Sequence, residues 1–255
     1  MVELKTPGEI EAMRAAGAVV AEALATVRAH AGIGVCLKDL DDVAAEVLRA
    51  AGATSPFLGY HPDWAPSPFP GVVCASVGDA VVHGIPGSYR LRDGDLVSID
   101  CGAVLDGWCG DAAVSFIVGT ADPEALALIA AAEDALARGV AAAVPGNRLG
   151  DIGAAIGGYV RSRGYGMLAD HGGHGIGRRM HEDPHVPNEG RVGRGMRLRP
   201  GLVLAVEPML HAGGGDAYRH DPDGWTLRTA DGSRAAHCEH TVAITEDGPV
   251  VLTSR

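Results

Sequence analysis

The sequence is poor in aromatic residues, in basic residues and in long apolar runs, and each shortage removes a class of protein. Aromatic side chains make up 4% of the 255 residues, too few for the stacking platforms of a single-stranded nucleic-acid binder. Lysine and arginine number 21 against 32 aspartate and glutamate residues, which gives a formal net charge of −11. Because such a charge repels a phosphate backbone, we expect no direct binding of nucleic acid.

Features of membrane and secreted proteins are also missing. The best apolar run, residues 202–205, is far shorter than the roughly 18 residues that a membrane-spanning helix needs. The first residues contain no basic segment followed by an apolar run, as a signal peptide would. The five cysteines are odd in number and form no C-x-x-C pair, which is typical of reduced thiols. We therefore expect a cytoplasmic protein without a membrane segment.

The remaining composition is that of a folded protein. Hydrophobic residues make up 47% and charged residues 21%, and the 37 glycines follow no three-residue period. No linker-like stretch divides the chain, so we expect a single domain over residues 1–255. Capping and turn signals predict helices at 6–31, 38–51, 122–144 and 149–163, and strands at 72–77, 80–83, 96–105, 112–118, 202–206, 225–229 and 239–245. This segregation of helices and strands favours an α+β fold.

One internal similarity suggests two related halves. Residues 37–40 (Leu-Lys-Asp-Leu) align with residues 149–152 (Leu-Gly-Asp-Ile) at an offset of 112, and Gly52 matches Gly164 at the same offset. The period is too long and the match too weak for a solenoid repeat. A duplicated unit and a chance likeness between two amphipathic helices explain these residues equally well.

A hairpin brings two acidic residues to one face. Asp106-Gly107 is a strong signal for a two-residue turn between the strand at 96–105 and the one that follows. With that turn, Asp111 lies opposite Gly102, and Asp100 is its diagonal neighbour on the same face. Two carboxylates in this position repel each other unless they share a proton, a cation or a metal ion.

Two further acids and a histidine occur in similar settings. Glu207 ends the apolar run at 202–206, Glu239 opens a strand, and His174 lies in the glycine-rich segment 171–177. Any one of them alone would ordinarily be structural. Four strand-borne carboxylates with one imidazole suit divalent ions such as Mn, Fe or Co, and four carboxylates neutralise two such ions.

The string from His181 to His185 matches the H-E-x-x-H motif of zinc peptidases. That motif works only on a helix, where both histidines share a face. Pro184 lies inside it and Pro187 just beyond, so we expect no helix and no zinc site of this kind.

The ligand spacing resembles that of type I methionine aminopeptidases. The similarity rests on Asp100, Asp111, His174, Glu207 and Glu239 and on the strings at 82–86, 94–100, 173–177, 206–209 and 239–241. The resemblance covers essentially the whole chain and implies the pita-bread fold. This α+β fold has two pseudo-symmetric halves, with antiparallel sheet and flanking helices.

The resemblance also implies a reaction, the hydrolytic removal of an N-terminal methionine with a preference for small second residues. It implies two divalent metal ions per chain, drawn from Co, Mn, Fe and Zn. Asp100 and Asp111 would bind one ion, and His174 and Glu207 the other, with Asp111 and Glu239 bridging both. Glu207 would also move the proton of the metal-activated water.

Two more histidines have family counterparts that contact the substrate. His83 and His181 would stabilise the tetrahedral intermediate, a role for donors directed at developing charge. We expect three other histidines to be non-ligands, namely His61, His171 and His185.

The methionine pocket transfers less completely. Five positions match those that line it in the family, namely Phe57, Tyr60, Cys74, Met180 and Trp225. Phe57 stands where some members carry cysteine, and Met180 where an aromatic residue is common, so the pocket stays apolar but changes shape. The segment 61–69 looks longer than in the shortest members of the family.

Other members of the superfamily are the alternatives. Xaa-Pro aminopeptidases and prolidases share the ligand set but usually carry a large N-terminal domain, and type II methionine aminopeptidases carry a late insertion. A non-catalytic pita-bread binding protein would typically have lost ligands, whereas all five are present here. The resemblance further implies a monomer that acts on peptides and on nascent chains at the ribosome.

Overall fold

The computed structural model describes residues 2–168 and 170–254. Its helices are α1 (Pro7–His30), α2 (Leu37–Ala50), α3 (Pro123–Ala142) and α4 (Leu149–Ser162). Its strands are β1 (Val73–Val77), β2 (Ala80–Val82), β3 (Leu96–Leu105), β4 (Trp108–Ile117), β5 (Gly166–Met167), β6 (Gly172–Gly175), β7 (Glu182–Pro187), β8 (Val203–Val206), β9 (Met209–His211), β10 (Tyr218–His220), β11 (Leu227–Thr229), β12 (Ala235–His237), β13 (His240–Thr245) and β14 (Gly248–Val251).

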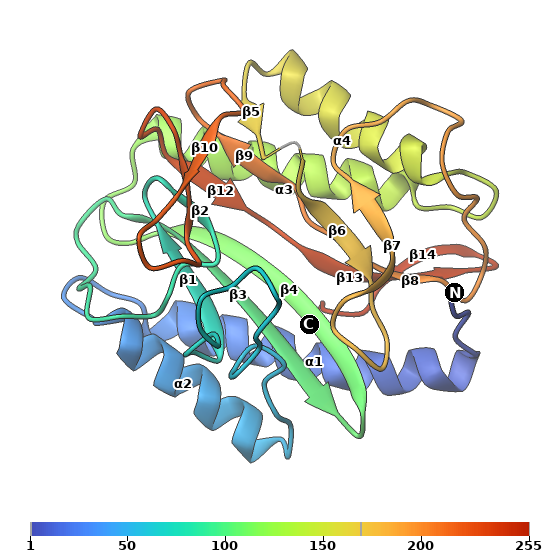
Figure 1. Ribbon diagram of the computed structural model, residues 1–255, viewed down its shortest axis with the longest axis horizontal. Coiled ribbons are helices and arrows are strands. Elements are labelled where there is room, and N and C mark those ends of the chain that lie inside the picture. The colour runs from blue at the N-terminus through green and yellow to red at the C-terminus, as the bar shows by residue number, and fades with distance from the viewer. Residues whose placement is uncertain (1, 169, 255) are drawn as a thin grey trace.

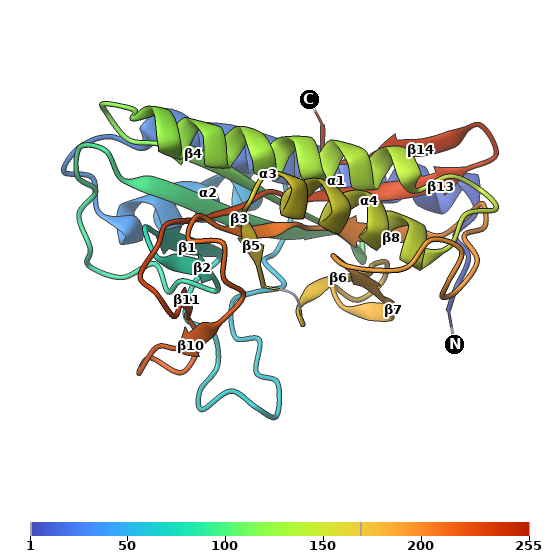
Figure 2. The same cartoon turned by 90° about the horizontal axis from the view of Figure 1, so that it is seen from above.

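Helices and strands form two layers. Figure 1 shows α1 and α2 along one side of the molecule and α3 and α4 along the other, with β4 and β13 running between them. In Figure 2 all the labelled helices lie on one face of the strands, while β10 and the neighbouring loops project from the opposite face. The helices thus cover one side of the sheets and leave the other side to loops.

The helix starts follow the local signals in the sequence. Thr6 caps α1 through a capping box, in which its hydroxyl accepts the Glu9 N–H and the Glu9 carboxylate accepts the Thr6 N–H at 2.8 Å. The Asp122 carboxylate caps α3 by accepting the Ala125 N–H at 2.9 Å. Proline occupies the first helical position in both helices, as the sequence predicts.

The internal similarity corresponds to a structural repeat. Helices α2 and α4 each span 14 residues and are separated by the offset of 112 along their whole length. Each is followed by a glycine of positive φ, 71° at Gly52 and 80° at Gly164. The preceding residues, Cys36 and Arg148, each form an isolated antiparallel bridge to a later segment. This repeat favours two related halves over chance similarity.

The predicted hairpin is present in the predicted register. β3 and β4 pair antiparallel around the turn at 106–107, with Gly102 opposite Asp111 and Asp100 opposite Ala113. The prediction that the second strand begins at residue 112 was wrong, because β4 already begins at Trp108. Asp111 therefore lies within the sheet and not beside a solvated turn.

Each half has its own hydrophobic cluster. One lies between α1, α2 and the sheet β1-β3-β4, and the other lies between α3, α4 and strands that include β8 and β13. The halves meet where Ala113 and Glu239 exchange backbone hydrogen bonds of 3.3 and 3.0 Å. This seam places β4 of the first half beside the start of β13 in the second. Among the described residues, no helix combines the length and apolar character that a bilayer crossing requires.

Candidate metal centre and substrate pocket

A cavity of about 430 Å³ opens where the two halves meet. All twelve site residues predicted from the sequence line it: Phe57, Tyr60, Cys74, His83, Asp100, Asp111, His174, Met180, His181, Glu207, Trp225 and Glu239. We call the acidic and imidazole part the polar floor, formed by Asp100, Asp111, His174, Glu207 and Glu239. We call the ring-bearing part the aromatic rim, formed by Tyr60, Trp64, Phe69, His83, His181 and Trp225.

Asp100 and Asp111 enter the polar floor from the β3–β4 hairpin. Asp111 is 4% exposed, and burial together with the charge of Glu207 raises its pKa to about 8. Burial and the neighbouring charge of Asp111 raise the pKa of Asp100 well above its usual value. Without a cation, this pair therefore holds protons at neutral pH, because desolvation disfavours two buried negative charges.

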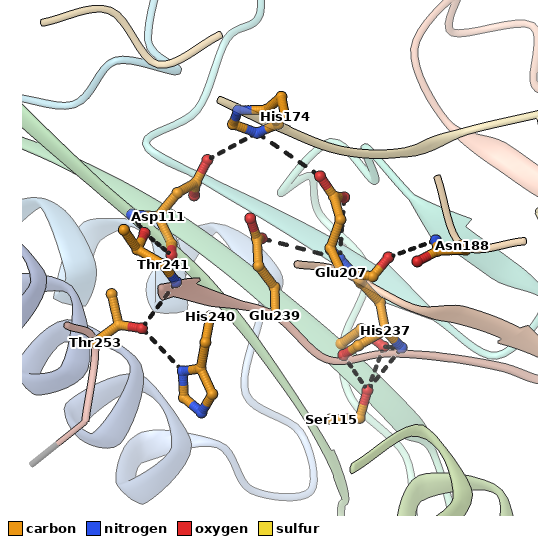
Figure 3. A network of polar contacts seen from close by, with 11 residues as sticks. Asp111, Ser115, His174, Asn188, Glu207, His237, Glu239, His240, Thr241 and Thr253 are labelled. Carbon is orange, nitrogen blue, oxygen red and sulfur yellow. Dashed lines mark hydrogen bonds and ion pairs between the residues drawn. The ribbon is translucent and has the colours of Figure 1, made fainter. Parts of the chain in front are cut away.

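Glu207 and Glu239 enter from the second half. Burial raises the pKa of Glu207 to about 8, and burial with the charge of Asp111 raises that of Glu239 well above its usual value. The backbone at both positions is fixed. The Asn188 amide donates to the Glu207 carbonyl at 2.9 Å (Figure 3). The Glu239 N–H donates to the Ala113 carbonyl at 3.0 Å.

Thr241 joins Asp111 to the second half. Its hydroxyl accepts the Asp111 N–H at 3.0 Å and donates to the Asp111 carbonyl at 2.8 Å (Figure 3). The Thr241 N–H in turn donates to the Thr253 hydroxyl at 3.2 Å. The acids of the two halves are thus held in fixed relative positions by hydrogen bonds between threonine hydroxyls and the main chain.

His174 directs a lone pair at the carboxylates. Its Nδ1 lies 2.9 Å from the Gly175 carbonyl, which accepts a hydrogen bond only if Nδ1 carries the proton. Burial lowers the pKa of the imidazole to about 3, so the ring is neutral and Nε2 is unprotonated. That nitrogen lies 3.7 Å from Glu207 Oε1 and 4.0 Å from Asp111 Oδ2 (Figure 3). A lone pair facing two carboxylates is stabilised by a cation between them.

The donor set fits divalent metal ions. Two groups of three residues could each hold an ion, because the possible ligand atoms within each group all lie within 4.8 Å of one another. The groups are Asp111–His174–Glu239 and Glu207–His237–Glu239. Three carboxylate oxygens of the floor are buried without a hydrogen-bond partner, one each on Asp100, Asp111 and Glu239. Buried oxygens without partners are costly, and metal coordination satisfies them. Carboxylates with one or two imidazoles suit Mn, Fe, Co or Zn.

His237 is a member of this cluster that the sequence interpretation missed. It is 2% exposed, and its Nε2 lies 3.5 Å from Glu207 Oε2 and 4.0 Å from Glu239 Oε2 without a hydrogen-bond partner. The missed signal was the strand period of two, since residues 237 and 239 face the same way along an extended chain. Its position beside two acids suits a residue that orients them.

His83 has the strained backbone of a functional position. Its φ is +59°, a left-handed conformation that few non-glycine residues adopt. The following Gly84 holds it against β1, because the Gly84 N–H donates to the Ser76 hydroxyl at 3.1 Å and its carbonyl accepts the Ala75 N–H at 2.8 Å. Nδ1 of His83 is buried without a partner, and burial lowers the imidazole pKa to about 3.

His181 bridges the polar floor and the aromatic rim. Its ring lies 4.4 Å from that of His174, centroid to centroid, and its Nδ1 lies 3.2 Å from the Tyr60 hydroxyl. Burial lowers its pKa. It precedes β7, so the H-E-x-x-H string is an extended strand and the expectation of no helix is confirmed.

The predicted apolar pocket residues surround the cavity. Phe57, Cys74, Met180 and Trp225 are each 8% exposed or less, and Tyr60 is 36% exposed. They provide a buried, uncharged surface next to the acids. Such a compartment suits an apolar side chain, because each methylene group that it buries adds about 0.8 kcal/mol.

The three histidines predicted to be non-ligands lie in different places. His171 and His185 line the cavity but belong to neither ligand group, and His61 bonds the Ala65 carbonyl at 3.1 Å. Two aromatic residues of the rim, Trp64 and Phe69, were not predicted as pocket residues. Both come from the long segment after Tyr60, where sequence spacing gives little guidance to side-chain direction.

The chain resembles known proteins over its full length. Residues 11–246 match the model of metallopeptidase family M24. A methionine aminopeptidase 1 of Mycobacterium tuberculosis is 52% identical over 99% of this chain and 95% of its own length. The crystal structure of methionine aminopeptidase from Thermotoga maritima is 41% identical, with a TM-score of 0.95 and full coverage of both chains.

A prolidase from Pyrococcus furiosus shares only the fold. It is 22% identical with a TM-score of 0.75, and this chain covers 65% of its length. The full-length identities to methionine aminopeptidases are far above that level and decide between the two subgroups. The chain has the pita-bread fold and belongs to metallopeptidase family M24 and, within it, to the methionine aminopeptidases.

Proposed function

We propose that this chain removes the initiator methionine from peptides and nascent proteins by metal-assisted hydrolysis. The observation that carries the proposal is the convergence of four buried carboxylates and a neutral imidazole beneath an apolar pocket. The relatives named methionine aminopeptidase support the choice of substrate. Small second residues would be favoured.

Two divalent ions are part of the proposal. Asp100 and Asp111 would hold one ion, His174 and Glu207 the other, and Asp111 and Glu239 would bridge them. When bound, the ions would polarise the scissile carbonyl and lower the pKa of an attacking water. When metal binding has ionised them, the four carboxylates would carry a −4 charge that balances two such ions, and the unpartnered oxygens would supply coordination positions.

The chain's own residues would handle substrate and protons. Glu207, a carboxyl group with a raised pKa, suits a proton carrier between water and the leaving amine. His83 and His181 lie around the cavity as donors for the oxygen that develops charge. Because both imidazoles have lowered pKa values, they would act as neutral donors.

The methionine side chain would occupy the apolar compartment. Phe57, Cys74, Met180 and Trp225 would surround its thioether, and Tyr60 would close the open side. An aromatic ring and a sulfur atom attract each other weakly at about 5 Å, which favours methionine over other apolar side chains.

The remaining properties follow the same proposal. Residues 1–255 would act as one catalytic domain, monomeric, in the cytoplasm, with access to chains leaving the ribosome. Sedimentation of the purified protein tests the monomer. Co-sedimentation with ribosomes, in low and high salt, tests the association.

The activity is tested by turnover after metal loading. The chelated protein is supplemented with Mn²⁺, Co²⁺ or Fe²⁺ and given Met-Ala-Ser or an Xaa-Pro peptide. We expect release of methionine from Met-Ala-Ser only in the presence of metal. Preference for the Xaa-Pro peptide would indicate a prolidase-like enzyme, and chelator-resistant turnover would exclude metal-assisted hydrolysis.

A further inference from the structure

The loop at residues 60–69 rises over the mouth of the cavity. In Figure 2 the cyan segment that includes it projects beyond the strand layer, on the face opposite the helices. At its base the Gly59 N–H donates to the Phe69 carbonyl at 2.9 Å, and the Phe69 N–H donates to the Tyr60 carbonyl at 2.8 Å. These bonds close the 60–69 loop at its two ends.

The outer part of the loop is held against the second half. The Trp225 indole N–H donates to the Ser67 carbonyl at 3.0 Å. Pro66 packs on Gly224, where a Cβ atom would lie 2.2 Å from the proline ring. Gly224 also has a φ of +79°, so this close contact depends on glycine. The 60–69 loop is therefore fixed to the wall of the methionine pocket.

This fixation places Trp64 at the exit of the cavity. Its ring stacks on His83 at 6.3 Å with an interplanar angle of 23°, and meets Trp225 edge-on at 5.0 Å. Both partners belong to the site, but Trp64 itself is 58% exposed whereas Trp225 is 4% exposed. An exposed indole that lies on two cavity residues is free on its outer side to contact a ligand.

A peptide held with its methionine in the buried compartment has to leave past this indole. The apolar residues that enclose the compartment are buried, whereas the exposed lining residues include Tyr60, Trp64 and His181. An extended chain advances by roughly 3.5 Å per residue. The exposed Trp64 ring contacts the buried Trp225 ring from the solvent side. The substrate residue directly after methionine is therefore the one that reaches Trp64.

We propose that Trp64 is a specificity-determining residue that limits the size of the second residue of the substrate. Its indole forms an outer wall beside His83 that accommodates Gly, Ala or Ser and excludes larger side chains. This inference rests on the proposed function, because it assigns a selective role to the same cavity. It explains what the extra length of the 60–69 loop does.

The test compares substrates within each variant. Wild type, Trp64→Ala and Trp64→Phe are assayed with Met-Ala-Ser, Met-Val-Ser and Met-Leu-Ser after metal loading. For each variant we compare kcat/KM for Met-Val-Ser with kcat/KM for Met-Ala-Ser. In Trp64→Ala this ratio should rise about tenfold, which is the discrimination that one or two methylene groups ordinarily give. Trp64→Phe should give a smaller rise, because a phenyl ring retains part of the wall.

The matched control is Leu58→Ala, because Leu58 is also 58% exposed and nearby in sequence but does not line the cavity. Its substrate ratio should equal that of wild type. An equal loss on all three peptides, or an unchanged ratio in both Trp64 variants, would overturn the inference. Wild type that fails to cleave Met-Ala-Ser would instead refute the proposed function, so the two failures are distinguishable.

Discussion

The polar floor and the aromatic rim hold their side chains by different means. Residues of the floor lie on or beside strands of both halves, and hydrogen bonds to their main chain, such as those between the Thr241 hydroxyl and Asp111, fix them. Much of the rim comes from loops, and Trp64 and Tyr60 remain partly in solvent. The floor is rigid and electrostatically costly without cations, whereas the rim carries uncharged rings and is partly open to solvent. The difference separates metal binding from substrate contact.

The largest effect should come from breaking the floor. His174→Ala and Glu207→Ala should each reduce kcat/KM for Met-Ala-Ser by about 10³-fold or more, because each removes a group that acts on developing charge or holds the metal. Thermal unfolding should show that the fold persists. His61→Ala is the control, since His61 lies outside both ligand groups. Near-normal turnover of either variant with bound metal would refute the assigned roles.

A weaker effect is expected at His237, which lies beside Glu207 and Glu239 of the floor. His237→Ala should lower the affinity for Mn²⁺ by about 10–100-fold, because residues that orient metal ligands contribute this much. His237→Gln, which keeps a hydrogen-bond donor toward Glu207, should recover part of it. Calorimetric titration of the metal-free protein measures the affinity directly. An unchanged affinity in His237→Ala would show that the imidazole only fills space.

At the rim, the smallest change in turnover should follow from Tyr60→Phe. This substitution removes the hydroxyl that lies 3.2 Å from His181 Nδ1 but keeps the ring. A single hydrogen bond contributes about 0.5–1.5 kcal/mol, so kcat/KM should fall about two- to tenfold. Steady-state kinetics with Met-Ala-Ser gives the value. A loss as large as that of His174→Ala would mean that Tyr60 takes part in the chemistry, which would end the separation between floor and rim.

The raised pKa values of the floor acids should also make stability depend on pH. Burial raises the pKa of Asp111 and of Glu207 to about 8 in the metal-free protein, from ordinary values of 3.8 and 4.5. The folded state then binds protons that the unfolded state has released. The contribution of these two groups to the free energy of unfolding is therefore fully present at low pH and is lost as the pH rises through about 8.

Thermal unfolding of the chelated protein between pH 7 and 8 measures this dependence, because the buried histidines contribute an opposite trend only below about pH 7. We expect the midpoint to fall with rising pH, and added Mn²⁺ to raise it most at pH 8, since the metal binds the ionised carboxylates. Glu207→Gln should flatten the dependence, whereas Trp64→Ala should keep it. A pH-independent midpoint in the chelated wild type would contradict the buried, protonated acids.

Local signals predicted the parts of the fold that neighbouring residues determine. The Asp106-Gly107 turn determines the hairpin, and the register follows because every later pair is counted from the turn. The capping residues Thr6 and Asp122 likewise fix the helix starts. The floor was predicted for a different reason, since its five residues lie in strings that resemble a known family. Their roles remain a proposal that the substitutions above test.

Contacts between distant segments explain what was missed. Strands β5, β10 and β12 contain two or three residues each and owe their existence to partners elsewhere in the chain. The strand period puts His237 on the same face as Glu239, but its approach to Glu207 depends on the pairing of β12 with β9, which joins distant segments. Trp64 is directed by the bond between Trp225 and Ser67, which joins residues 158 positions apart.

The seam between β4 and β13 also determines how the molecule can be divided. Asp100 and Asp111 precede α3, whereas His174, Glu207 and Glu239 follow it, so the repeated helices are not matched by repeated ligands. A chain cut at residues 118–122 would give two fragments, each with an incomplete ligand set. Hydrolysis regained on mixing them would report reassembly of the halves, which makes the seam a natural split point for a complementation sensor.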